Sequence, residues 1–363
     1  MGWRDLRVLT FPDNQRAVRN PYCDLLYGHM KESGVTVEGF TPWRALFGRY
    51  DVFHLHWPEY YLTQSVTKAI IGTPAVLFLV AWLRLRGTRI IWTLHNLHTH
   101  QRSFPTAERW FWQSFTRMLD GYISLNEFSA AKARALFPAL QSIPGVVIPH
   151  GHYRGSYPST VSKAQARKLL GIDAEENLLL FFGTISPYKN VPHLIRTFRE
   201  TGLKNSTLFI AGHPGIQEER RVRDAAAGDK RVLLHLERIP AEEVQTFFAA
   251  ADLVIIPYTE VANSGSVILA LSLDRPVLVP AQGAMPEVQA RVGSEWVYTY
   301  DSEFSSEHLI SGIAWARETT RDSQTNLADF DWTDIARDTF ATYCDVVNGI
   351  VSTSITPLRS DLD

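Results

Sequence analysis

Residues 251–287 constrain the fold more than any other part of the chain. They contain a short apolar run at 253–257, a second one at 276–279, and helical spacing between them at 267–273. Apolar runs of this length, separated by a helix, are typical of buried parallel strands joined by a crossover helix. This stretch therefore predicts an α/β domain with a parallel sheet.

The loop before the expected helix consists of small and polar residues, namely Asn263, Ser264, Gly265 and Ser266. Small residues at a helix start leave backbone N–H groups open, and together with the positive end of the helix dipole these favour an anion such as a phosphate. The alternative is an ordinary serine N-cap, which requires no ligand. Both interpretations remain open at this point.

The same alternation of strands and helices extends along the whole chain. Strands are expected at 7–11, 35–40, 52–57, 89–94, 122–125 and 146–149, and then at 178–183, 207–211, 232–236, 253–257 and 276–279. The chain is 363 residues long, which is long for one core, and residues 154–163 are rich in Gly, Ser, Pro and Thr as in a linker. We therefore expect domains over residues 1–153 and 154–330, a helix within 331–351, and a tail over 352–363.

Composition narrows the class of protein. The two cysteines, Cys23 and Cys344, lie near opposite ends of the chain, so the sequence offers no disulfide framework and no cysteine metal cluster. The first residues do not resemble a signal peptide, and we expect a cytoplasmic protein. Residues 1–150 hold 16 Lys and Arg against 10 Asp and Glu, whereas the remainder holds 20 against 28. A basic first half suits an anionic partner; the alternative is an unevenly charged, solvated surface.

The longest apolar run, Ala69–Leu83, is interrupted by a glycine and a proline and is shorter than the roughly 20 residues that span a bilayer. Arg84, Arg86 and Arg89 follow it. One interpretation is a helix at the surface of an anionic membrane, which would place the protein peripherally on the inner face of that membrane. The other is a helix that packs on the parallel sheet.

Polar side chains follow the expected strands of the first half, at the sheet edge where ligands of doubly wound folds bind. They are Asp13 after the first strand, His54, His56 and Glu59 at the end of the third, and His95, His98 and His100 after the fourth. Five histidines in two adjacent loops could indicate a metal site, but their spacing matches no known metal motif. Contacts with substrate hydroxyls and hydrogen-bonded structural histidines are the alternatives.

In the second half, Lys189 follows the expected strand 178–183 and precedes a helix over 192–200. At the carboxyl edge of a sheet, its ammonium group could reach a diphosphate. The alternative is an ordinary solvent-facing lysine.

Several short motifs, in this order along the chain, resemble the GT-B glycosyltransferases. The motifs are Gly183–Val191, Ala211–His213, Ile256–Tyr258, Ser264–Ser266, Asp274–Val277 and Pro286–Glu287. Within that class the chain is most similar to the large sugar-nucleotide-dependent family that builds polysaccharides, glycolipids and lipid-linked oligosaccharides. The resemblance implies two Rossmann-like doubly wound domains with a cleft between them, and a closing helix that packs back toward the first domain.

The resemblance also implies roles for individual residues. The second domain would bind a UDP- or GDP-sugar, with the diphosphate on Lys189 and on the loop of Asn263, Ser264, Gly265 and Ser266. The base pocket would be lined by Gly212, His213 and the main chain at Arg238 and Ile239, with His150 beside the donor site. The first domain would hold a glycan or lipid-linked acceptor, with Glu59, His98 or His100 facing the cleft. We expect no cofactor, no metal and no nucleic-acid partner.

The chain departs from the family pattern at three positions. The family usually has an arginine where this chain has Thr184, and two glutamates where it has Val261 and Leu269. Glu287 is our substitute candidate for a sugar or ribose contact, and a charge that favours a helix N-terminus is the alternative.

We expect a metal-independent glycosyltransferase, because a helix N-terminus and Lys189 could neutralise the leaving diphosphate. An inverting enzyme would need a general base such as Asp13, Glu59 or a histidine, whereas a retaining enzyme depends more on positioning. The sequence leaves the two open. The alternative functions are a sugar-nucleotide epimerase or phosphorylase on the same fold, and a binding protein that has lost catalysis.

Overall fold

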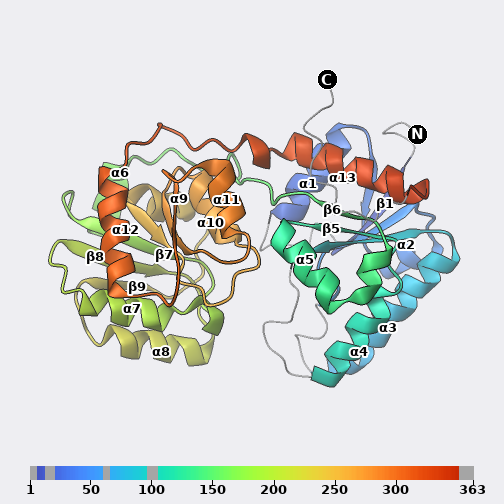
Figure 1. The fold of residues 1–363 in the computed structure, drawn as a ribbon, viewed down its shortest axis with the longest axis horizontal. Helices are drawn as coiled ribbons and strands as arrows, with labels where there is room; N and C mark the ends of the chain where they lie inside the picture. Colours follow the sequence, from blue (N-terminus) through green and yellow to red (C-terminus); the bar gives the residue numbers. More distant parts are fainter. Residues whose placement is uncertain (1–5, 13–20, 60–65, 96–104, 351–363) are drawn as a thin grey trace. The chain divides into compact units, whose positions relative to one another are not determined.

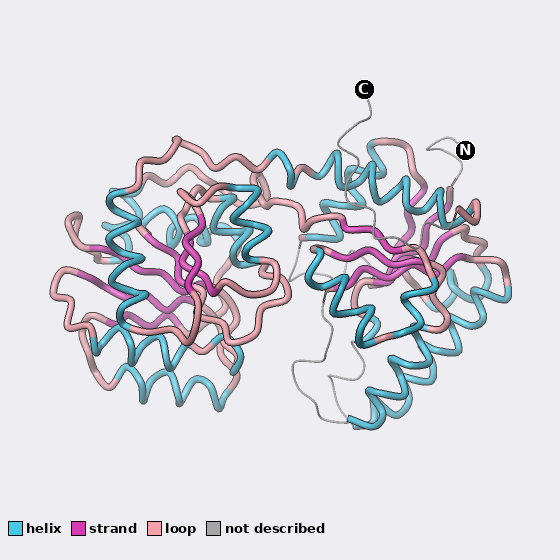
Figure 2. The backbone as a smooth tube through the Cα atoms, in the orientation of Figure 1, coloured by secondary structure: helices cyan, strands magenta, loops and turns pink. Residues whose placement is uncertain are grey.

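The computed structural model describes residues 6–12, 21–59, 66–95 and 105–350. Contacts between Cα atoms divide the chain into unit 1, residues 1–151 and 330–363, and unit 2, residues 152–329. Each unit contains one six-stranded parallel sheet with helices around it (Figures 1 and 2). The expected fold class, two doubly wound α/β domains, is confirmed.

In unit 1 the strand order is β2-β1-β3-β4-β5-β6, and it reverses direction between β1 and β3. The strands are β1 Arg7–Phe11, β2 Thr36–Gly39, β3 Val52–Leu55, β4 Arg89–Leu94, β5 Gly121–Ser124 and β6 Gly145–Val147. The helices are α1 Tyr22–Glu32, α2 Pro42–Phe47, α3 Val66–Leu85, α4 Pro105–Thr116, α5 Glu127–Leu136 and α13 Trp332–Val347, with a 3₁₀ turn at Pro138–Ser142.

Successive residues of these strands point to opposite faces of the sheet, and each face has its own core. Phe53 and Trp92 pack with α3 and α4 on one face, whereas Val52 and Ile91 pack with α1 and α13 on the other. The C-terminal helix α13 lies beside α1 (Figure 1). Helix α13 is therefore part of the unit formed by the start of the chain.

In unit 2 the strand order is β12-β11-β10-β7-β8-β9, which is the order of the dinucleotide-binding Rossmann fold, and it reverses between β7 and β10. The strands are β7 Asn177–Phe182, β8 Ser206–Ala211, β9 Val232–His235, β10 Leu253–Ile255, β11 Val277–Pro280 and β12 Val297–Tyr300. The helices are α6 Lys163–Leu170, α7 Val191–Glu200, α8 Ile216–Ala226, α9 Ala241–Ala250, α10 Gly265–Ser272, α11 Met285–Val292 and α12 Ser306–Glu318, with 3₁₀ turns at Pro187–Lys189 and Ala328–Phe330.

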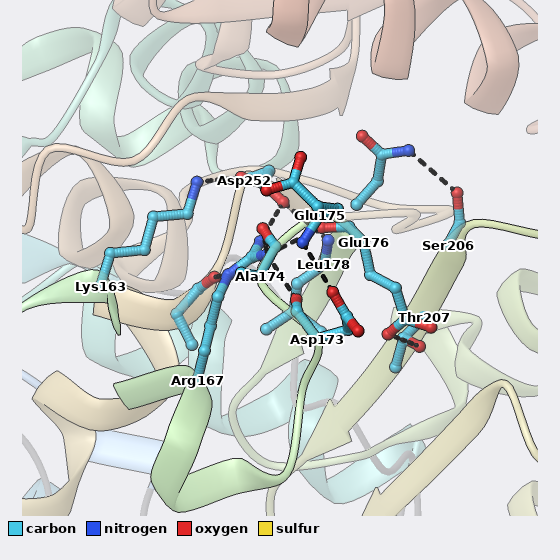
Figure 3. A network of polar contacts seen from close by, with 12 residues as sticks. Lys163, Arg167, Asp173, Ala174, Glu175, Glu176, Leu178, Ser206, Thr207 and Asp252 are labelled. Carbon is cyan, nitrogen blue, oxygen red and sulfur yellow. Dashed lines mark hydrogen bonds and ion pairs between the residues drawn. The ribbon is translucent and has the colours of Figure 1, made fainter. Parts of the chain in front are cut away.

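A buried ion pair fixes the amino ends of β7 and β10 (Figure 3). The Arg167 guanidinium of α6, only 4% exposed, donates to the Asp252 carboxylate at 2.6 Å and to the carbonyls of Asp173, Ala174 and Glu176 at 2.7–2.9 Å. Asp252 also accepts from the backbone N–H of Leu178 at 2.7 Å. The pair therefore aligns the two strands at which the strand order reverses.

Several elements were not predicted from the sequence, namely helices α2, α6 and α12 and strand β12; β12 and α2 show why. Strand β12 is half-buried and lies at the sheet edge, so its residues VYTY form no apolar run. Helix α2 is only six residues long. The sequence nevertheless contains its start signals, because Thr41 caps it by accepting from the Arg44 N–H and Pro42 occupies its first turn. Both are elements for which packing, rather than hydrophobic periodicity, determines the structure.

Helix α3 packs on the sheet, as one interpretation of Ala69–Leu83 expected, and buries Val76, Leu77, Val80 and Leu83. Within the described residues, no helix is long and apolar enough to cross a membrane.

Candidate functional site

The strand-order reversal in unit 2 defines a site at the carboxyl ends of β7 and β10. Ligands of doubly wound sheets bind where adjacent strands send their connections in opposite directions, because a crevice opens there. Strand β7 leads into Gly183 and the turn Pro187–Lys189, and β10 leads into the loop before α10. The segments around Lys189 and Ser264, which are far apart in sequence, thus meet at one edge of the sheet.

Gly183 shows how closely these segments approach. A Cβ atom placed on this glycine would lie 3.3 Å from Ser266 Oγ and 3.5 Å from Lys189 Nζ. Its φ of 120° lies in the region that favours glycine. The hydroxyl of Tyr258 donates to Ser266 Oγ at 3.3 Å. The Lys189 ammonium group and the Ser266 hydroxyl therefore lie close to the backbone of Gly183, which has no side chain.

Lys189 is buried, with 8% of its side chain exposed, and is not the solvent-facing lysine of the alternative interpretation. Its Nζ lies 5.2 Å from the centre of the Tyr258 ring and 6.0 Å from that of Tyr188. Burial alone lowers the pKa of Lys189, but the Tyr258 and Tyr188 phenols outweigh burial and raise the pKa above its ordinary value. The side chain is therefore a buried cation held between two aromatic rings.

The geometry of the turn explains why Lys189 points inward. Pro187 starts a single 3₁₀ turn, and Asn190 ends it in the left-handed conformation with φ of 56°. The backbone N–H of Thr259, in the loop after β10, donates to the Tyr188 carbonyl at 2.9 Å. This bond joins the Lys189 turn to the loop that carries Tyr258.

The start of α10 has the serine N-cap that one interpretation of its sequence expected. Ser264 is the N-cap, and its Oγ accepts from the Val267 N–H at 3.3 Å. That bond satisfies one of the free N–H groups at the helix start and leaves others for a ligand. A Cβ on Gly265 would lie 3.3 Å from the Tyr153 hydroxyl. The helix start is therefore capped and also closely packed.

The other donor-site candidates lie around the same sheet edge. Gly212 follows β8 with φ of 151°, and a Cβ there would overlap the Gly183 carbonyl. Thr184, His213 and Arg238 are exposed, whereas Ile239, Asn263 and Glu287 are half-buried, Glu287 in the first turn of α11. The two positions at which the family usually has glutamates, Val261 and Leu269, are buried at 6% and 7% exposure. Their apolar side chains pack in the core.

In unit 1 the histidines of the third and fourth strands form a buried hydrogen-bonded cluster. His54 Nε2 is bonded to Thr93 Oγ1 at 2.7 Å, and its Nδ1 lies 2.8 Å from the Tyr27 hydroxyl and 2.6 Å from that of Tyr343. His56 Nε2 is bonded to the same Tyr27 hydroxyl at 2.6 Å. Both rings point to the face covered by α1 and α13. His54 and His56 are thus structural histidines, one of the alternatives weighed from the sequence.

His95 extends this cluster, with its Nε2 2.9 Å from His56 Nδ1. Burial lowers the pKa of His54 to about 3 and holds the pKa values of His56 and His95 well below their ordinary range, and neighbouring imidazoles add to the effect. The cluster is neutral at pH 7. Among the residues that the structure describes, no three His, Cys, Asp or Glu side chains are placed to hold a metal ion.

The acceptor-side candidates belong to unit 1. Glu59 follows β3 and is 6% exposed, next to the point where the order of this sheet reverses. Asp13, His98 and His100 lie outside the described residues. His150 is also in unit 1; its Nδ1 donates to the Gly151 carbonyl at 2.8 Å, and burial lowers its pKa to about 4. Its ring packs edge-on against Tyr22 at 5.0 Å.

Sequence reasoning missed the aromatic partners of the site. Tyr188 and Tyr258 flank Lys189, and Tyr27 and Tyr343 connect the histidines. Tyr258 stands in the Ile256–Tyr258 motif, which could have indicated its position, but no local pattern pairs Tyr343 with His54, 289 residues away.

Comparisons with known proteins agree with this geometry. Residues 176–310 match the protein family described as "Glycosyl transferases group 1". The chain is 31% identical, over 348 residues, to the GDP-mannose:glycolipid 4-beta-D-mannosyltransferase of Xanthomonas campestris pv. campestris. That alignment covers 94% of this chain and 93% of the relative. The similarity therefore includes both units and is not confined to one shared domain.

Two solved structures have the same fold. Anabaena HepE in complex with UDP and glucose has a TM-score of 0.65 and 17% identity, covering 93% of this chain and 99% of that protein. Sucrose-phosphate synthase of Thermosynechococcus elongatus has a TM-score of 0.61 and 19% identity, covering 85% of this chain and 76% of that protein. These likenesses confirm the GT-B architecture.

Proposed function

We propose that this chain, which belongs to the group 1 glycosyltransferases, transfers mannose from GDP-mannose to a hydroxyl group of a glycolipid. The chain is a glycosyltransferase by its family; the identity of the donor and of the acceptor is the part that we add. Both substrates are named in the relative that aligns with 93% of its length, and that relative is a transferase. A sugar-nucleotide epimerase is accordingly the weaker alternative.

The observation that carries the donor part is the buried cation beside the start of α10. Lys189 Nζ and Ser266 Oγ both lie within 3.5 Å of the position that a Cβ on Gly183 would take, at the strand-order reversal of unit 2. A nucleoside diphosphate bound there would place its phosphates on the ammonium group and on the free N–H groups of α10. We assign the base to the neighbourhood of Gly212 and His213, and the sugar or ribose to that of Glu287.

In the transfer, an acceptor hydroxyl attacks the anomeric carbon of the donor, and the bond from that carbon to the diphosphate oxygen breaks. Negative charge then develops on the diphosphate, where Lys189 and the dipole of α10 stabilise it. We propose that these groups suffice without a metal ion. Incubation with EDTA should leave the rate unchanged, and a strict requirement for magnesium or manganese would contradict this part.

The acceptor hydroxyl also loses a proton. Glu59 is our described candidate for a residue that contacts the acceptor, because it is a carboxylate that follows β3 at the reversal in unit 1. Asp13, His98 and His100 remain further candidates. We also propose that the protein works at the cytoplasmic face of a membrane as a peripheral protein, since a glycolipid acceptor is anchored there.

A donor panel tests the proposal. The purified chain is incubated with GDP-mannose, other GDP-sugars and UDP-sugars, with and without a glycolipid acceptor, and both the released nucleotide and the sugar products are measured. We expect GDP release with GDP-mannose and label transferred to the glycolipid. An epimerised sugar nucleotide in the absence of acceptor would indicate an epimerase. Binding of a donor without turnover of any donor would indicate a binding protein.

A further inference from the structure

Unit 1 contains an apolar cavity of about 390 Å³ between α2, α3 and the sheet. All the residues that line it are apolar. Its lining runs from Phe78, which is 65% exposed, to Phe53 and Leu55, which are about 1% exposed. The cavity therefore reaches from the surface into the core, and it offers a ligand hydrophobic contact but almost no hydrogen bonds.

Large apolar side chains surround this cavity on the outside. We call Trp43 and Phe47 of α2, together with Phe78, Trp82 and Leu85 of α3, the α2–α3 surface. Trp43, Phe47 and Leu85 are each more than 70% exposed, and the rings of Trp43 and Phe47 stack at 5.7 Å. Single exposed apolar residues are normal, but a contiguous group around an apolar cavity marks an interaction site.

Helices α2 and α3 lie side by side (Figure 1). Trp82 Nε1 donates to the Leu46 carbonyl at 3.2 Å, and the Arg86 guanidinium donates to the same carbonyl at 2.6 Å. Phe78, Trp82 and Leu85 are spaced by four and three residues, which places them on the same side of α3. The exposed side chains of α3 therefore lie on one side of that helix, and hydrogen bonds to the Leu46 carbonyl join that helix to α2.

Helices α2 and α3 contain arginines and no Asp or Glu. Neither residues 39–50 nor residues 60–107 contain any Asp or Glu, whereas both segments contain arginines. Arg44, Arg49 and Arg86 are exposed; Arg44 pairs with Glu38 of β2, and the Arg86 guanidinium lies 5.6 Å from the Trp82 ring centre. Exposed arginines and tryptophans next to apolar side chains are the composition of a protein face at the phosphate level of a bilayer.

We propose that the α2–α3 surface docks on an anionic lipid bilayer and that the cavity takes up one hydrocarbon chain of a lipid. The lining without polar groups fits an alkyl chain, and the arginines fit lipid phosphates. The role of this surface in supplying a lipid-linked acceptor rests on the proposed function, whereas lipid binding by itself does not. An exposed apolar face without acidic residues complements lipid phosphates better than it complements a second positively charged copy of itself.

The first experiment measures docking. The full chain is sedimented with vesicles of phosphatidylcholine alone and with vesicles that also contain phosphatidylglycerol, at low and at high salt. We expect binding to the anionic vesicles and weaker binding at high salt, because exposed charges are screened. The double variant Trp43→Glu/Phe78→Glu should reduce binding about tenfold or more, since it removes apolar insertion and adds repulsion. Leu169→Glu in α6, at a residue 70% exposed in unit 2, is the matched control and should bind normally.

The second experiment locates the hydrocarbon chain. Phosphatidylglycerol with a photoreactive diazirine in one acyl chain is incorporated into the vesicles, and the cross-linked peptides are identified by mass spectrometry. We expect cross-links at residues 40–55 and 72–85. Ala75 lines the cavity and is exposed, so Ala75→Trp should fill the cavity mouth and abolish these cross-links while the protein still sediments with anionic vesicles. Filling the cavity can strongly weaken the binding of a hydrocarbon chain there, because each methylene removed from water contributes about fourfold in affinity.

Each remaining outcome would overturn the inference. Equal sedimentation of the double variant and the unmodified protein would exclude the α2–α3 surface. Cross-links confined to other segments would exclude the cavity. If the unmodified protein does not bind anionic vesicles and is a dimer, and the double variant is a monomer, then a second copy of the chain covers this face. None of these measurements uses a sugar nucleotide, so their failure is distinguishable from failure of the donor assay.

Discussion

The two sheets bury polar groups in different ways. The largest polar cluster described in unit 1 consists of neutral side chains, with His54, His56 and two tyrosine hydroxyls hydrogen-bonded in its core. In unit 2 the main polar cluster is a charged pair, with the Arg167 side chain 4% and the Asp252 side chain 22% exposed. In both, each group has its partners, which is the condition for burying it at all. The comparison shows that the same architecture can hold either a neutral hydrogen-bonded cluster or a charged pair. The kind of cluster determines whether acid or the loss of one partner destabilises the unit.

The clusters also occupy opposite edges of their sheets. Arg167 and Asp252 lie at the amino ends of β7 and β10, and this leaves the carboxyl ends for Lys189. The histidine cluster of unit 1 includes His95, just after the carboxyl end of β4. In unit 2 the ion pair is therefore spatially separate from the proposed ligand site, whereas in unit 1 the buried network approaches the edge where Glu59 lies.

The largest expected effect is a selective loss of stability of unit 1 in acid. An unfolded histidine titrates near pH 6.5, and burial lowers the pKa of His54 to about 3, with His56 and His95 also well below normal. Below pH 6.5 the unfolded chain therefore binds more protons than the folded one. The free energy of unfolding of unit 1 is highest above that pH. It falls by about 1.4 kcal/mol per pH unit for each histidine as the pH drops toward the pKa values of the folded state.

Urea unfolding at pH 7.5 and pH 5.5, followed by hydrogen exchange of peptides from each unit, measures this difference. Peptides of unit 1 should lose protection at lower urea concentration at pH 5.5, and those of unit 2 should change little. Equal shifts in both units would show that the histidine cluster is not the cause.

Removing one partner of the ion pair should weaken unit 2 at neutral pH. Arg167→Met leaves Asp252, whose side chain is 22% exposed, with Lys163 and the Leu178 N–H as partners, so we expect the free energy of unfolding to fall by about 3 kcal/mol, the lower end of the range for a buried pair. Urea unfolding at pH 7.5 measures the change. Lys163→Met is the matched control, because Lys163 also pairs with Asp252 but is half exposed, and its loss should cost about 1 kcal/mol at most. Similar values for both variants would contradict the assignment.

Lys189→Ala should weaken donor binding without weakening the fold to the same degree. Loss of a charge-assisted contact costs about 1.5–3 kcal/mol, or roughly tenfold to more than a hundredfold in affinity. Calorimetric titration with GDP measures it, and Lys168→Ala, on an exposed position of α6, is the control. If Lys189→Ala is folded and binds GDP as tightly as the unmodified chain, Lys189 does not contact the diphosphate.

The smallest effect is expected for Tyr343→Phe. The Tyr343 hydroxyl lies 2.6 Å from His54 Nδ1, which is also bonded to Tyr27, so Nδ1 keeps Tyr27 as its partner and Nε2 keeps Thr93 after the change. We expect the free energy of unfolding to fall by about 0.5–1.5 kcal/mol. Tyr27→Phe should cost more in the same urea experiment, because the Tyr27 hydroxyl serves both His54 and His56. A larger loss for Tyr343→Phe than for Tyr27→Phe would show that the hydrogen bond from α13 contributes more to the network than those from α1.

Much of the fold could be predicted from the sequence, because buried parallel strands such as 178–182 and 253–255 are continuous apolar runs bounded by turn residues. The edge strand β12 could not, since half of its side chains face solvent. The alternation of His54 and His56 predicted that they share a face, but their partners come from α1 and α13, which no local pattern connects.

The position of Lys189 at the carboxyl edge of the sheet also followed from its place after a strand. Its burial did not, because burial depends on Tyr258, which is brought beside it only by the pairing of β7 with β10. Similarly, the α2–α3 surface could not be predicted in full, because the apolar run of α3 was visible in the sequence whereas the short helix α2 was not.

The packing of α13 on unit 1 sets the order in which the chain can fold during its synthesis. Unit 2 has all of its strands once residue 329 has left the ribosome. Unit 1 begins earlier but still lacks Trp332, whose ring fills the space beside Gly151, and Tyr343 in its core. Of the two units, the one whose strands are translated first is therefore completed last, and until α13 has been synthesised a nascent chain exposes the apolar face of α1 to chaperones.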